Sequence, residues 1–142
     1  MYDDILLPTD GGDGTGAALV HAEALATAFD ATVHVLYVAD TNRDSVTTLQ
    51  GGETLDVLVG TGERIVGDTA DSLDQRIERV TEVVQGTPHR TIVDYVDQYG
   101  IDVVVMATHG REGLERYLLG SVTEKVVRAA PVPVLTVRFD GE

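Results

Sequence analysis

Several features that would point to specific chemistry are missing from this chain of 142 residues. It has no cysteine, which excludes disulfides, thiolate nucleophiles and zinc sites built on cysteine. No apolar run approaches the roughly 18 residues that a membrane-spanning helix needs. The first ten residues lack a basic region followed by an apolar stretch, so they do not resemble a signal peptide. We therefore expect a cytoplasmic protein.

Positive charge is also scarce. The 24 acidic residues outnumber the 10 basic ones, the formal net charge is -14, and Lys125 is the only lysine. Such a negative field opposes binding to nucleic acids or anionic lipid surfaces, so neither is expected as a partner. High charge can simply maintain solubility. The near-absence of lysine beside abundant aspartate favours a second explanation, a salt-rich cytoplasm as in halophilic archaea, where ions screen the repulsion between carboxylates.

Short apolar runs alternate with segments of helical periodicity along the whole chain. The expected strands cover residues 2–7, 31–39, 77–84, 101–107 and 134–137. The expected helices cover residues 16–29, 55–74, 88–100 and 121–129, and a polar loop is expected over 41–54. Glycines weaken the second of these helices. Strands that alternate with helices predict one doubly wound α/β domain, a parallel sheet covered on both faces.

Two segments that follow expected strands carry residues suited to binding a phosphate. The first is PTDGGDGTG, residues 8–16, and the second is ATHGREGLERYLLGSVTE, residues 107–124. Ligands of open parallel sheets bind beyond the carboxyl ends of the strands, where both segments are expected to lie. Glycine lets the backbone approach a phosphate closely, and free N–H groups at a helix start favour an anion.

Within the second segment, the N–H groups of Gly120, Ser121 and Val122 are expected to be free at the start of a helix. The hydroxyls of Ser121 and Thr123 add neutral donors, while His109 and Arg111, flanking Gly110, supply positive charge. Ser121 is also expected to cap this helix, in a capping box with Glu124.

These residues resemble the nucleotide-binding motif of the universal stress proteins. ATP-binding members of that family carry Gly, two residues, Gly, nine residues, then Gly-Ser or Gly-Thr. This sequence has Gly110, nine residues and Gly120-Ser121, with Ala107 in place of the first glycine. The stretch LLGSVTEKVVRAAPVPVLTVR, residues 118–138, is the most similar to the family.

The resemblance implies a single domain over residues 1–142, with five parallel strands in the order 3-2-1-4-5 and helices on both faces. It implies that ATP or AMP is bound, with Asp10 near the ribose or a Mg²⁺ ion, backbone groups of Val38 at the adenine, and Met106 lining the base pocket. It also implies a homodimer through the last strand, residues 134–138. The nucleotide-binding residues are then Pro8, Thr9, Asp10, Val38, Met106, Ala107, His109, Gly110, Arg111, Gly120, Ser121, Val122 and Thr123.

Other interpretations of these residues stay open. Asp10 and Asp13 lie beside glycines and can act as turn-formers whose carboxylates bond nearby backbone. His34 lies within an apolar strand and is expected to be a satisfied core residue. Residues 12–17 fit the G-x-G-x-x-A pattern of dinucleotide-binding domains, with Asp40 at the end of the second strand.

A further alternative is a nucleotide-free family member that acts by protein interaction. Efficient phosphoryl transfer needs a positioned base and cations, and the residues available here are few. We therefore expect nucleotide binding with at most slow hydrolysis, and no catalytic residue is assigned.

Overall fold

The computed structural model describes residues 1–40, 51–108 and 120–138, and its elements alternate as the sequence predicts. The strands are β1 (Asp4–Pro8), β2 (Thr32–Asp40), β3 (Arg79–Gly86), β4 (Val103–Ala107) and β5 (Val134–Val137). The helices are α1 (Asp13–Phe29), α3 (Gly51–Asp71), α4 (Pro88–Tyr99) and α5 (Ser121–Ala129). Within these ranges, no helix is both long enough and apolar enough to cross a membrane.

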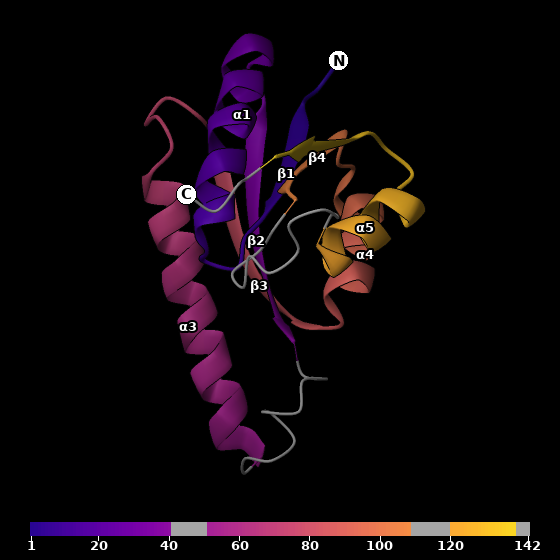
Figure 1. Cartoon of the computed structure of the whole chain (residues 1–142). Coiled ribbons are helices and arrows are strands. Elements are labelled where there is room, and N and C mark those ends of the chain that lie inside the picture. The colour runs from indigo at the N-terminus through magenta and orange to yellow at the C-terminus, as the bar shows by residue number, and fades with distance from the viewer. Residues whose placement is uncertain (41–50, 109–119, 139–142) are drawn as a thin grey trace.

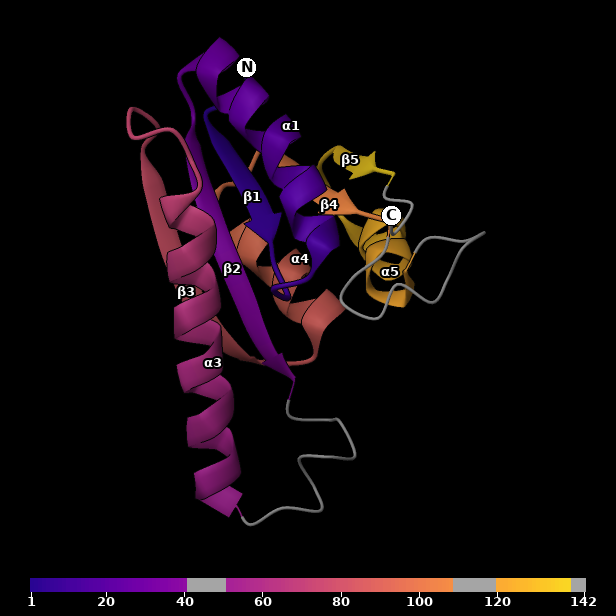
Figure 2. The same cartoon turned by 60° about the vertical axis from the view of Figure 1, so that its left-hand side comes forward.

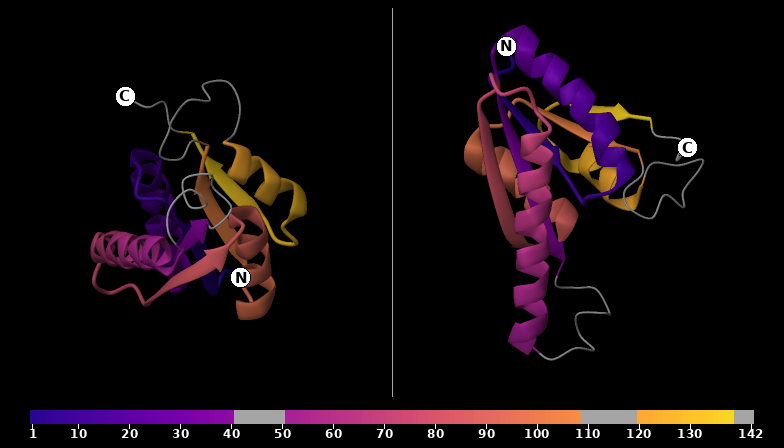
Figure 3. Two further views of the ribbon diagram at one scale, coloured as in Figure 1. Left: turned by 90° about the horizontal axis from the view of Figure 1, so that it is seen from below. Right: turned by 90° about the vertical axis from the view of Figure 1, so that its left-hand side faces the viewer.

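The strands form one parallel sheet in the order β3-β2-β1-β4-β5, which confirms the expected order 3-2-1-4-5. Helices α1 and α3 cover one face of the sheet, and α4 and α5 cover the other (Figures 1 and 2). The view along the strands in the left panel of Figure 3 shows the three layers. A sheet covered on both faces must bury apolar side chains on both, as the β-branched runs of β2 and β4 predict.

Successive residues of each strand point to opposite faces, so the sheet divides the core into two clusters. Ile5 and Leu7 of β1 belong to the cluster under α1 and α3. Leu6 of β1 and Leu36 of β2 belong to the cluster under α4 and α5. All four side chains are fully buried. This alternation determines toward which face of the sheet the side chain of each residue at the carboxyl end of a strand points.

His34 is a core residue with both ring nitrogens hydrogen-bonded, as expected from its place in an apolar strand. Its Nε2 lies 2.9 Å from the Asp4 carboxylate and its Nδ1 lies 2.9 Å from the Tyr95 hydroxyl. An ionised carboxylate only accepts hydrogen bonds, so Nε2 carries the hydrogen on that side. These two hydrogen bonds join β1, β2 and α4 on the face of the sheet that α4 covers.

Helix α3 differs from the sequence prediction at its start and in the role of its glycines. It begins at Gly51, within the residues expected to form a loop, and its first turns extend beyond the sheet (Figures 1 and 3). At Gly62 a Cβ atom would lie 2.3 Å from a ring carbon of Tyr37. The glycine therefore lets α3 pack directly on the Tyr37 ring, which compensates for its low helix propensity.

Strand β3 begins two residues later than expected, because Ile77 belongs to the connection before it. Arg79 opens the strand and donates hydrogen bonds to the carbonyl oxygens of Ala70, Asp74 and Ile77. This guanidinium satisfies carbonyls at the end of α3 and in the turn that follows, so it holds the turn against the strand.

Candidate functional site

The carboxyl ends of β1, β2 and β4 meet at one edge of the sheet. From β1 the chain continues into α1 on one face, and α5, which follows β4, lies on the other. The sheet order reverses between these two strands, and in open α/β sheets the crevice at such a point is where ligands bind. Both motif segments therefore start at this crevice.

The turn from β1 to α1 is held by its own side chains. The Thr9 amide donates to the Leu36 carbonyl at 2.9 Å, so the pairing of β1 with β2 extends past the strand. The Thr9 hydroxyl accepts from the Gly11 amide at 3.1 Å, and the Asp10 carboxylate accepts from the Gly12 amide at 2.9 Å. Gly11 has a φ of 82°, a conformation that favours glycine. Asp10 is thus a turn-former, as its neighbouring glycines indicate.

Two hydrogen bonds join the start of α5 to the end of β4, and a third joins the end of β4 to β5. The Thr123 hydroxyl donates to the Ala107 carbonyl at 2.9 Å, and the Thr123 side chain is buried. The Gly120 amide donates to the Thr108 carbonyl, and the Thr108 amide donates to the Val137 carbonyl of β5 at 2.9 Å. These bonds fix where the N-terminus of α5 lies relative to the crevice.

The capping box predicted for Ser121 and Glu124 is wrong. The N-cap is Gly120, and no side chain of the residues that the structure describes caps the helix. Ser121 is the first helical residue and is exposed, so its hydroxyl lies within the first turn instead of before it. Glu124 instead forms an exposed ion pair with Arg128 at 3.1 Å.

The expectation of a free N–H at Gly120 is also wrong, because the Thr108 carbonyl accepts from it. The first intrahelical bond runs from the Glu124 amide to the Gly120 carbonyl at 2.9 Å. The amides of Ser121, Val122 and Thr123 therefore precede the hydrogen-bonded part of α5, where a helix has N–H groups without intrahelical partners.

The remaining candidate residues divide between the two faces of the sheet. Met106 is buried in the cluster under α4 and α5, and Val38 is partly buried against the same cluster. Ala107 packs instead against the cluster under α1 and α3. Pro8 ends β1 at the crevice. His109, Gly110 and Arg111 lie outside the described residues.

The sequence did not predict two sets of contacts at this edge of the sheet. Thr108 bonds both Gly120 and Val137 through its backbone, which no side-chain pattern reveals. Thr69 of α3 lies 3.5 Å from the Thr9 hydroxyl, although 60 residues separate them in the chain. Among the described residues, no group of three or more His, Asp or Glu could hold a metal ion.

Comparison with known proteins agrees with this architecture. Universal stress protein MJ0531 of Methanocaldococcus jannaschii is 35% identical over 141 residues, covering 97% of this chain and 83% of that protein. The solved structure of protein MJ0577 superposes with a TM-score of 0.89 at 30% identity, covering 100% of this chain and 99% of the other. A universal stress protein solved in complex with cAMP has a TM-score of 0.68 at 23% identity, covering 96% of this chain and 97% of the other.

A family model agrees with these individual proteins over almost the whole chain. The model of the universal stress protein family matches residues 1–138, which include all five strands and both motif segments. The chain belongs to the universal stress protein family.

Proposed function

We propose that this protein is an adenine-nucleotide-binding module that holds ATP or AMP in the crevice between β1 and β4. Its role is in a stress response or in signalling within the cytoplasm, with at most slow hydrolysis of the nucleotide. The observation that carries the proposal is the N-terminus of α5, which no side chain of the described residues caps and which is hydrogen-bonded to the end of β4, where the sheet order reverses.

The phosphates would bind at this N-terminus. Amides that precede the first helical bond, together with the positive end of the helix dipole, form a ready site for an anion. Gly120 has φ -57° and ψ 152°, values that a residue with a side chain adopts freely. The backbone conformation therefore does not require a glycine at this position. A phosphate that approaches the backbone closely would require one, because a side chain would block it. The exposed Ser121 hydroxyl adds a donor.

The adenine would lie on the face of the sheet covered by α4 and α5. Val38 and Met106 both belong to that face, with Val38 at the rim and the buried Met106 as the floor. The Ala107 side chain packs against the opposite face. The methyl that distinguishes this motif from the family pattern is therefore directed away from the proposed base pocket, and the substitution is compatible with binding.

Asp10 would contact the ribose or a Mg²⁺ ion bound with the phosphates. Magnesium sites of nucleotide-binding proteins commonly combine one or two carboxylates with phosphate oxygens, so a single aspartate suits this role. One Asp10 oxygen already accepts from the Gly12 amide, which orients the carboxylate. Efficient phosphoryl transfer requires more positioned groups than this, which supports binding with slow turnover.

A direct experiment is to denature the purified protein and analyse the supernatant for bound nucleotide, then titrate nucleotide-free protein with ATP and Mg²⁺. We expect bound or bindable adenine nucleotide, and phosphate release over hours would measure hydrolysis. Failure to bind either ATP or AMP in such titrations would contradict the proposal. It would favour the alternative of a nucleotide-free member acting through protein contacts.

The homodimer would form through β5. This strand lies at the edge of the sheet, and its Leu135 side chain is 39% exposed. An edge strand with an apolar exposed side chain is suited to pairing with a second chain. Leu135→Lys should shift the mass measured by light scattering from dimer to monomer. The control is Val80→Lys, because Val80 is 37% exposed on the opposite edge strand, β3. A monomeric native protein would refute this interface.

A further inference from the structure

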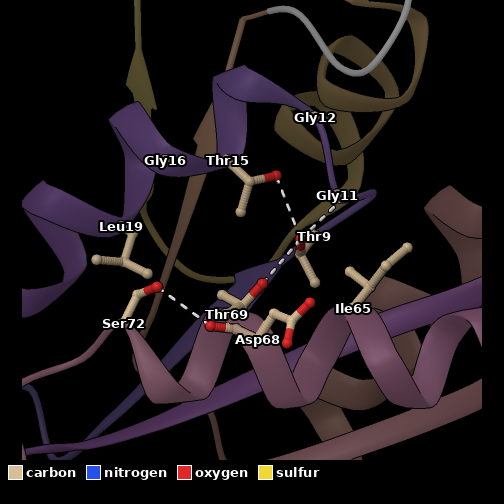
Figure 4. A pocket seen from close by; sticks show the side chains of 10 residues that line it. All are labelled: Thr9, Gly11, Gly12, Thr15, Gly16, Leu19, Ile65, Asp68, Thr69 and Ser72. Atoms are coloured by element: carbon tan, nitrogen blue, oxygen red, sulfur yellow. Dashed lines mark hydrogen bonds between the residues drawn. The ribbon is translucent and has the colours of Figure 1, made fainter.

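A second pocket lies between α1 and α3, on the face opposite the proposed base pocket. It has a volume of about 370 Å³ and is lined by the ten residues labelled in Figure 4. Figure 4 shows α1 on one side and α3 on the other, with Thr9 between them. This volume falls within the range of small-molecule sites.

The inner wall of the pocket is a cluster of three threonine hydroxyls from three different segments. Thr9 is only 7% exposed, and its hydroxyl lies 3.3 Å from that of Thr15 and 3.5 Å from that of Thr69. Hydrogen bonds between hydroxyls are usually about 2.5–3.0 Å long. These longer separations leave the hydroxyls weakly satisfied by one another. A ligand hydroxyl could bond them more strongly.

The charges around the pocket exclude an anion and give little preference for a cation, so a neutral ligand suits it best. Asp68 is the single ionisable residue among these ten described residues, and none of the ten is cationic. This carboxylate, in a chain of net charge -14, opposes an anion. The N-terminus of α1 contributes Gly12 to the wall, and the positive end of its dipole weakens the attraction of Asp68 for a cation.

Hydroxyl groups match the lining because they both donate and accept hydrogen bonds. They can donate to the Asp68 carboxylate and exchange bonds with the threonine cluster. Leu19 and Ile65 supply apolar surface for the C–H faces of such a molecule. A compact polyhydroxylated ring presents both kinds of surface.

We propose that this pocket binds a small neutral polyhydroxylated molecule, a monosaccharide or cyclic polyol. The pocket shares Thr9 with the β1–α1 turn but lies on the other face of the sheet from Val38 and Met106. The proposal therefore does not depend on nucleotide binding.

Gly16 of α1 allows the pocket to be blocked without disturbing the fold. It lines the pocket, and a Cβ built on it meets no atom within 4 Å. Gly16→Leu therefore fills the pocket instead of clashing with the protein. Gly60 of α3 is a matched control, because it is also an exposed helical glycine with no atom within 4 Å of its Cβ, and it does not line the pocket.

The test is a titration of the ¹⁵N-labelled full chain with glucose and, separately, with myo-inositol, followed by amide chemical shifts. We expect saturable shifts at Thr9, Gly11, Thr15 and Thr69 in the native protein and in Gly60→Leu. In Gly16→Leu the affinity should fall at least about tenfold, equivalent to 1.4 kcal/mol. Thr69→Val removes one hydroxyl at nearly constant shape and should weaken binding several-fold. It serves as a second variant if Gly16→Leu does not fold.

Three results would overturn the proposal. One is the absence of saturable shifts with either probe, which would mean that the pocket holds only water. Another is equal affinity in Gly16→Leu and the native protein. The third is tighter binding of inorganic phosphate or of an ammonium ion than of either polyol. Titration of the same sample with ATP reports on Ser121 and Val122 at α5, so failure of this proposal is distinguishable from failure of nucleotide binding.

Discussion

Gly62 lies in the middle of α3, where the helix packs on the sheet. Adding one methyl group there, in Gly62→Ala, tests how closely the two pack. A Cβ at this position would lie 2.3 Å and 2.9 Å from two ring carbons of Tyr37. Tyr37 is itself only 9% exposed and belongs to the core cluster under α1 and α3. It has little room to move, so Gly62→Ala must displace either the ring or the helix.

The magnitude follows from two opposing contributions. Replacing a helical glycine by alanine stabilises a helix by about 1 kcal/mol, while overpacking a core costs about 1–3 kcal/mol. Gly60→Ala gains the first contribution alone, because no atom lies within 4 Å of its Cβ. We therefore expect Gly60→Ala to stabilise the protein and Gly62→Ala to be about 1–3 kcal/mol less stable than Gly60→Ala.

Urea unfolding followed by circular dichroism measures both variants against the native protein. Similar m-values would show that the midpoints report on stability. Because the change of residue is the same in one helix, the difference between the variants isolates the contact with Tyr37. Equal stability of Gly60→Ala and Gly62→Ala would refute the packing of α3 described above.

Three further perturbations test other parts of the structure. Thr123→Val removes the hydroxyl that donates to the Ala107 carbonyl and should lower stability by about 1–2 kcal/mol and weaken ATP binding, whereas Thr123→Ser should largely preserve both. Burial, followed by the charge of Glu82, raises the pKa of the Tyr95 hydroxyl in the folded protein. The folded state therefore favours the protonated hydroxyl, and the contribution of Tyr95 to the free energy of unfolding is complete below about pH 10 and is lost as the pH rises further. In urea unfolding, the stability difference between the native protein and Tyr95→Phe should therefore narrow above about pH 10, and a constant difference would contradict this. Thermal stability should rise from low to molar KCl as ions screen the acidic surface, and a melting temperature that does not rise would remove the argument for a salt-rich habitat.

The strands and the burial of the sheet on both faces were predictable, because β2 and β4 are β-branched runs of the kind that parallel sheets bury on both faces. The positions of the elements followed from apolar periodicity, and the order 3-2-1-4-5 came from the family resemblance. Helix α3 was predicted less well, since its glycines count against a helix in isolation. The Tyr37 ring that makes Gly62 favourable comes from β2, and this contact cannot be seen in the local sequence.

The candidate site was predictable in its location but not in its hydrogen bonds. The motif places Gly120 to Thr123 after β4, and the fold brings them to the crevice. Whether Ser121 or Gly120 caps α5 depends on a shift of one residue, which sequence patterns do not determine. The bond between Gly120 and Thr108 and the closeness of Thr9 to Thr69 arise from tertiary structure, so neither could be derived from spacing.

The most direct test of nucleotide binding is calorimetric titration of ATP with Mg²⁺ into the native protein and into Gly120→Val. Valine is compatible with the backbone conformation of Gly120, so the variant should fold, as its circular dichroism would verify. Its side chain would stand where the phosphates are expected to approach the start of α5. We predict saturable binding to the native protein and none to the variant. Equal affinity in the two proteins would show that the nucleotide does not bind at α5, and no binding to either would contradict the proposed function.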